Sequence, residues 1–212
     1  MLVTPAPPAE DRAALVRRAR LLAWIGVGWH VIEAAIAILA GLAASSIALI
    51  GFGADSLIES AAGFIVLWRF AAARSASAGA ERRAQQLIAI SFYVLAAYIA
   101  IEATRSLIGG DEPATSWVGI ALAAFTAATM PPLAIAKARV GAKLNSSATT
   151  SEGRQNMLCA YLAAALLVGL LGNAVAGAWW LDPVVGLLIA AVAVVEGRQA
   201  WRGEGCSCCA AG

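Results

Sequence analysis

The stretch Ser45 to Phe70 reads SSIALIGFGADSLIESAAGFIVLWRF and places two acids, Asp55 and Glu59, among apolar and small residues. A spacing of four residues puts both carboxylates on one face of a helix. Charged groups inside a bilayer are costly unless something binds them, so this pair is a functional candidate. The same face also carries Phe52, Ser56, Ser60 and Gly63. A polar and small face of this kind is predicted to lie against other helices or water, not lipid.

The composition around this stretch is typical of an integral membrane protein. Of the 212 residues, 61% are hydrophobic and 13% are charged, against about 45–50% and about 25% in soluble domains. A membrane-spanning helix needs about 20 apolar residues. The sequence offers such windows at approximately 21–44, 47–68, 84–108, 117–136, 157–180 and 184–200. We therefore predict an all-α integral membrane protein with six transmembrane helices.

The positive charges indicate how the chain is oriented. In a six-span arrangement, Arg105 is the one basic residue of 15 that falls on the opposite side from the rest. The positive-inside rule then places both termini in the cytoplasm and the protein in the cell (inner or plasma) membrane. We expect a cytoplasmic leader at 1–20 without a cleavable signal, a transport domain at 21–202 and a short tail at 203–212.

A second polar face follows in the fifth predicted helix. Glu152, Gln155, Asn156 and Cys159 recur at helical spacing, and their side chains offer carboxylate, amide and thiolate donors. Such donors bind divalent transition metals, and four of them from two facing helices suit a tetrahedral ion such as zinc. We therefore predict that Asp55, Glu59 and this face form one metal site, with Glu152 and Asn156 nearer its cytoplasmic mouth.

Two further groups are candidates for handling ions. His30 and Glu33 lie three residues apart in the first predicted helix and could pair or serve in ion entry or proton coupling. The tail carries three thiols, Cys206, Cys208 and Cys209, which could capture a soft metal ion or be palmitoylated.

Other residues lead to structural predictions. We expect an ion pair between Glu102 and Arg105, an interhelical hydrogen bond from Asn173, and capping of the sixth helix by Asp182. Pro131 and Pro132 are expected to break or kink the fourth helix. The first and last helix pairs should be tight hairpins, and longer polar links are expected at 69–83 and 137–151.

The residues at 54–60 and 151–159, together with the turn at 179–183, resemble the transmembrane domain of the cation diffusion facilitator (cation efflux) family. Matched to that family, Asp55 and Glu59 take the ligand positions of helix two. Gln155 and Cys159 take those of helix five, where members usually carry His and Asp. The resemblance implies a cation-efflux-like bundle, proton antiport, a homodimer and a transmembrane-only member without the cytoplasmic domain found in many members.

We accordingly expect a transporter that exports Zn²⁺ or a related divalent cation from the cytoplasm, with the ion as substrate and no cofactor. The expected partners are the lipid bilayer, the metal ion, protons and a second copy of the chain, and no nucleic acid. One alternative is a proton-coupled organic-cation or multidrug exporter, which would favour aromatic residues on these faces. An intramembrane enzyme is a weaker alternative, because the sequence has no Cys-His pair at helical spacing and no zinc-protease motif.

Overall fold

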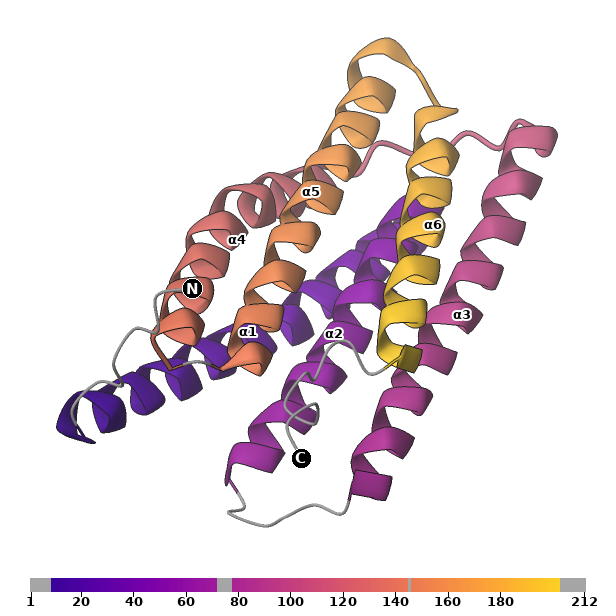
Figure 1. Ribbon diagram of the computed structural model, residues 1–212. Coiled ribbons are helices and arrows are strands. Elements are labelled where there is room, and N and C mark those ends of the chain that lie inside the picture. Colours follow the sequence, from indigo (N-terminus) through magenta and orange to yellow (C-terminus); the bar gives the residue numbers. More distant parts are fainter. Residues whose placement is uncertain (1–8, 72–77, 145, 203–212) are drawn as a thin grey trace, which may run out of the picture.

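The structure is a computed structural model that describes residues 9–71, 78–144 and 146–202. These residues form six α-helices and no strand (Figure 1). The helices are α1 (Ala9–Ala44), α2 (Ile47–Ala71), α3 (Ala78–Gly109), α4 (Trp117–Leu144), α5 (Ser147–Ala176) and α6 (Leu181–Arg202). The fold is therefore all-α, as predicted.

The helices pack in two groups. α4 lies against α5 and α1 lies against α2, while α3 pairs with α6 and both contact α2 (Figure 1). One apolar core joins α1, α2, α4 and α5 with part of α6, and includes Phe52, Met130 and Cys159. A second core joins α3 and α6 with α2, around Phe92 and Ile99. Helix α2 thus connects the two groups.

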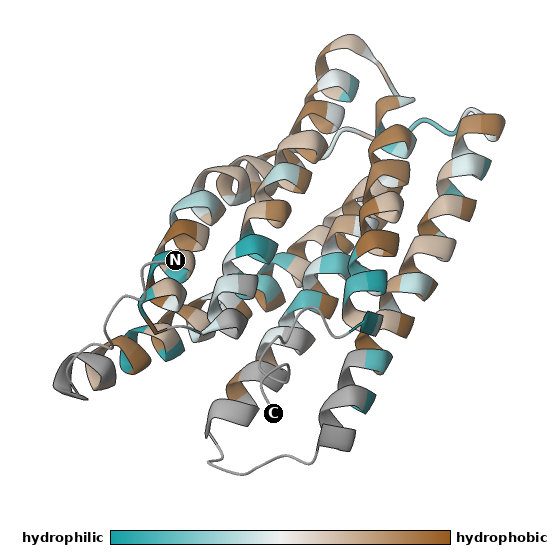
Figure 2. Ribbon diagram, in the orientation of Figure 1, coloured by the Kyte–Doolittle hydropathy of each residue, from teal (hydrophilic) through white to brown (hydrophobic). Residues whose placement is uncertain are grey.

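The outer surface is apolar, as expected for lipid contact. α1, α3, α4 and α5 contain segments long and apolar enough to cross a membrane, at Ala13–Ala44, Gln86–Gly109, Trp117–Leu144 and Glu152–Ala176. Ile108 and Val175 are each 83% exposed, which a soluble surface would rarely tolerate over a wide area. In Figure 2, most of the strongly hydrophilic positions lie in the lower half of the bundle, near the end of α4 and the start of α5. These features indicate a helical membrane protein; six spans stay a prediction.

Several helix bounds differ from the predicted ones. α1 begins at Ala9, so residues 9–20 of the expected leader are its first turns. α4 continues to Leu144, and its helical backbone is not broken at Pro131 and Pro132. α5 begins at Ser147, where Ser146 accepts a hydrogen bond from the Thr149 backbone N–H, so the expected long link at 137–151 is wrong. The link predicted at 69–83 is too long, because α2 continues to Ala71 and α3 begins at Ala78; residues 72–77 lie outside the described residues.

The two expected hairpins are present. Ser45 and Ser46 join α1 to α2. α5 ends at Ala176 and is followed by Gly177, whose φ of 62° is the left-handed conformation that glycine adopts most readily. The predicted ion pair is also present, since the Arg105 Nη1 lies 2.8 Å from the Glu102 Oε1.

The predicted cap from Asp182 to its own helix and the predicted bond from Asn173 to another helix are wrong. The Asp182 carboxylate accepts hydrogen bonds from the Ser46 hydroxyl at 2.5 Å and from the backbone N–H of Ile47 at 2.9 Å, so it caps α2 and not its own helix. Asn173 Nδ2 donates to the carbonyl of Pro113 at 2.8 Å, in the connection between α3 and α4. Sequence spacing carries no information on such long-range partners.

Candidate cation site at the crossing of four helices

The Glu33 carboxylate of α1 lies where four helices meet. Its Oε2 accepts a hydrogen bond from the Ser56 hydroxyl of α2 at 3.0 Å, and its Oε1 accepts one from the Thr126 hydroxyl of α4. The Cys159 thiol of α5 donates to Oε2 at 3.8 Å. Glu33 is fully buried. A carboxylate can accept about four hydrogen bonds, and hydroxyl and thiol groups donate three of them here.

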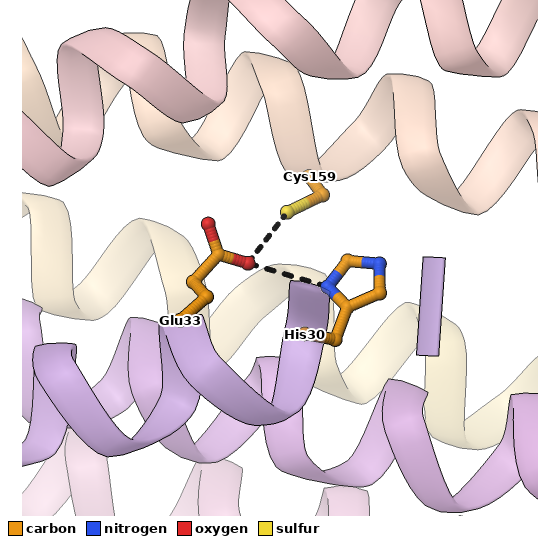
Figure 3. A group of neighbouring side chains, drawn as sticks. All are labelled: His30, Glu33 and Cys159. Atoms are coloured by element: carbon orange, nitrogen blue, oxygen red, sulfur yellow. Dashed lines mark hydrogen bonds and ion pairs between the residues drawn. The ribbon is translucent and has the colours of Figure 1, made fainter. Parts of the chain in front are cut away.

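His30 brings a second carboxylate to this group. Its Nδ1 lies 3.2 Å from Glu33 Oε2, one helical turn away, and 3.6 Å from the Oε2 of Glu59 in α2. Figure 3 shows the His30 ring and the Cys159 sulfur converging on the same Glu33 oxygen. We call His30, Glu33, Glu59 and Cys159 the four-donor group.

Three members of the four-donor group lie close enough together to share a metal ion. The donor atoms of His30, Glu33 and Cys159 all lie within 4.8 Å of one another. Metal–ligand bonds of about 2.0–2.3 Å set ligand atoms about 3.3–3.8 Å apart at a tetrahedral centre. His30 Nδ1 lies 3.2 Å from Glu33 and 3.6 Å from Glu59, and the Cys159 sulfur lies 3.8 Å from Glu33. Imidazole, carboxylate and thiolate are also the donor types that zinc prefers.

One atom of the group has no partner. Glu59 Oε2 is buried and makes no hydrogen bond with the described residues, although it lies near the His30 ring. A buried carboxylate oxygen without a donor is costly. A bound cation, a proton or a water would satisfy it.

Close to the four-donor group, a lysine is buried. Lys137 in α4 has a side chain only 4% exposed, and its Nζ donates to Asn156 Oδ1 at 3.0 Å and lies 3.2 Å from Glu152 Oε2. Asn156 donates in turn to the sulfur of Met130 at 3.2 Å. The two α5 residues that the sequence suggested for the ion's entrance are therefore held by an ammonium.

A small cavity of about 20 Å³ lies beside these residues, with room for about one water. Its lining includes Gly26, His30, Glu59, Lys137, Glu152, Gln155 and Asn156. The cavity thus joins part of the four-donor group to the lysine and its acceptors.

The predicted site residues are only partly brought together. Cys159 and Glu59 belong to the four-donor group, whereas Gln155 lines the cavity and makes no side-chain hydrogen bond with the described residues. Asp55 is buried in α2, and no hydrogen bond or ion pair joins it to the group. Its role as a ligand stays a prediction. The predicted tail thiols Cys206, Cys208 and Cys209 lie outside the described residues.

Three residues of the site escaped the sequence analysis as functional groups. Ser56 and Thr126 were overlooked because hydroxyl groups are common in membrane helices, although Ser56 did fall on the predicted polar face of α2. Lys137 was taken as a charge in a cytoplasmic link and is instead a buried residue of α4. His30 and Glu33, predicted for entry or proton coupling, form the centre of the group.

No known family model matches the chain.

Proposed function

We propose that this protein is a membrane transporter of divalent metal cations, with zinc as the first candidate, and that the four-donor group binds the ion during transport. The observation that carries the proposal is the convergence of one imidazole, one carboxylate and one thiol, from His30, Glu33 and Cys159, within 4.8 Å of one another, with the Glu59 carboxylate 3.6 Å from the same imidazole. His30, Glu33 and Cys159 lie in α1 and α5, within segments long and apolar enough to cross a membrane. Ionisable groups at such positions commonly mark ion pathways.

Proton exchange follows from the chemistry of the donors. The Cys159 thiol donates a hydrogen bond to Glu33, and a zinc–sulfur bond would require the thiolate. Binding of one ion therefore releases the thiol proton, and protonation of the thiolate favours release of the ion. This exchange is the physical basis for the proposed proton antiport.

The resemblance to the cation diffusion facilitator family supports the same proposal and supplies its direction, which is export from the cytoplasm by a six-span homodimer. The family pattern and the structure differ in the helices that would supply the metal ligands. The family pattern would place the ligands on helices two and five, whereas the four-donor group adds His30 and Glu33 from α1.

The alternatives are less favourable. An organic cation is far larger than the cavity of about 20 Å³ that adjoins the group. His30 and Cys159 do lie close together, as the nucleophile and base of an enzyme would. Both are buried, however, with Cys159 only 1% exposed. A nucleophile needs a substrate within bonding distance, so this burial favours an ion site over a catalytic pair.

A liposome assay tests the proposal. Purified protein is reconstituted with a zinc-sensitive dye inside and a pH-sensitive dye in a parallel sample, and zinc is added outside. We expect zinc entry with an opposing proton flux, and near-complete loss of both in Glu33→Gln. Glu102→Gln is the matched control, because Glu102 pairs with Arg105 on an exposed face of α3. Equal zinc flux in protein-containing and empty liposomes would refute the transport function.

A further inference from the structure

The ammonium of Lys137 occupies a position that a metal ion could use. Its two recorded partners are the Oδ1 of Asn156, at 3.0 Å, and the Oε2 of Glu152, at 3.2 Å. Carboxylate and amide oxygens are also ligands for divalent cations. The lysine therefore holds the oxygens that an entering ion would otherwise bind.

The surrounding helices are shaped to accommodate this ammonium. Gly26 of α1 faces it so closely that a Cβ at position 26 would lie 2.6 Å from Lys137 Nζ. No real Cβ contact is so short, so a side chain there would force the ammonium to move. A buried lysine is costly unless its charge is compensated, and here Glu152, 11% exposed, is the compensating anion.

The lysine is also close to the proposed metal ligands. The cavity of about 20 Å³ that Lys137 lines is lined by His30 and Glu59 of the four-donor group as well. The carboxylates of Glu33, Glu59 and Glu152 thus lie near one lysine and one histidine, and those of Asp55 and Glu196 add negative charge around Glu59. The positive charge of the lysine offsets part of this negative charge when no metal is bound.

We propose that Lys137 is a tethered cation that competes with the transported ion: it is bound to Glu152 and Asn156 in the empty protein and leaves them when a divalent cation enters. This inference rests on the proposed transport function. The competition sets a threshold, since a monovalent or weakly binding ion gains too little from these oxygens to displace the ammonium. Lys137 is therefore a selectivity residue and not a ligand.

Chemical labelling of the wild-type protein tests the displacement directly. The chain has two lysines, Lys137 and Lys143, and Lys143 is exposed. Acetylation by an N-hydroxysuccinimide ester, read by peptide mass spectrometry, therefore reports on both side chains in one sample. We expect Lys137 to react slowly without metal and severalfold faster with saturating zinc, while Lys143 reacts at the same rate in both. An unchanged or slower reaction of Lys137 with bound zinc would overturn the inference.

A binding measurement provides the second test. In Lys137→Gln the competing charge is absent, so we expect the zinc affinity of the detergent-purified protein to rise about tenfold, or about 1.4 kcal/mol. A lysine with a purely structural role predicts unchanged or weaker binding, because Glu152 and Asn156 lose their partner, and that result would contradict the inference. The proposed metal site and the proposed role of Lys137 are refuted by different results. Wild-type protein that binds no zinc refutes the metal site itself, whereas zinc binding without any effect at Lys137 refutes the tethered cation alone.

Discussion

The Thr126 hydroxyl of α4 donates a hydrogen bond to Oε1 of Glu33 in α1, across 93 positions of sequence. This contact orients the carboxylate. With Oε1 held by Thr126, Oε2 is the oxygen that meets His30, Cys159 and the Ser56 hydroxyl. A hydrogen bond to a metal-binding carboxylate orients it in the same way in many metal sites.

Thr126→Val should therefore weaken zinc binding without removing any of the four donors. Loss of a partner that orients a ligand commonly costs about 10–100-fold in metal affinity, and we expect a loss in this range. Isothermal titration of the purified protein measures it. Thr129→Val is the control, since Thr129 is half-buried in the same helix and its hydroxyl bonds to the backbone carbonyl of Phe125 and not to Glu33. Equal affinities in the two variants would show that Thr126 does not position Glu33.

The helical fold was predictable because its signals are local. Apolar windows, short turns and the ion pair of Glu102 and Arg105 depend on residues near one another in the chain. The helix ends were less predictable. The polar first turns of α1 and the last turns of α4 extend beyond the apolar windows, so hydropathy alone places the helix ends too early or too late.

The site was predictable only where one helix carries the pattern. Glu59 and Cys159 were identified from helical spacing and resemblance, and both lie in the four-donor group. Their connection through His30 and Glu33 depends on how α1 packs against α2 and α5, which no spacing within one helix encodes. The same reason explains why the role of Lys137 was not predicted. Its basic side chain is typical of a polar link, but α4 continues past it and buries it.

Cys159→Ser should change the preference among metals. The thiol is the soft donor of the four-donor group, and cadmium depends on soft ligands more than manganese does. We expect the substitution to lower cadmium affinity strongly, zinc affinity less and manganese affinity least. Competition against a metal-sensitive dye gives the three affinities in one protein preparation. An unchanged ranking of the metals would exclude Cys159 as a ligand.

Glu59→Gln and Asp55→Asn should differ in their effect on equilibrium binding, although the sequence pairs the two acids. Glu59 Oε2 lies 3.6 Å from His30 Nδ1 and has no hydrogen-bond partner among the described residues. Asp55 is not joined to the four-donor group by any hydrogen bond or ion pair. We expect Glu59→Gln to lose zinc affinity by a larger factor than Asp55→Asn, measured by titration at one pH. The reverse order would move the ion along α2 toward Asp55 and away from His30.

Asp182→Ala should destabilise the whole bundle, because this carboxylate links the start of α6 to the start of α2. It accepts hydrogen bonds from the Ser46 hydroxyl and from the backbone N–H groups of Ile47 and Ala48, and it is 3% exposed. Removing a buried acceptor leaves such donors unpaired at a cost of about 1–3 kcal/mol. We expect a lower unfolding temperature in detergent, measured as the loss of the monodisperse peak in size-exclusion chromatography after heating. The control is Asp111→Ala, whose acid is exposed in the connection before α4.

Bound zinc should raise the unfolding temperature of both variants equally, since Asp182 lies outside the four-donor group. A selective loss of the zinc effect in Asp182→Ala would show that the α2 cap also holds the metal ligands in place.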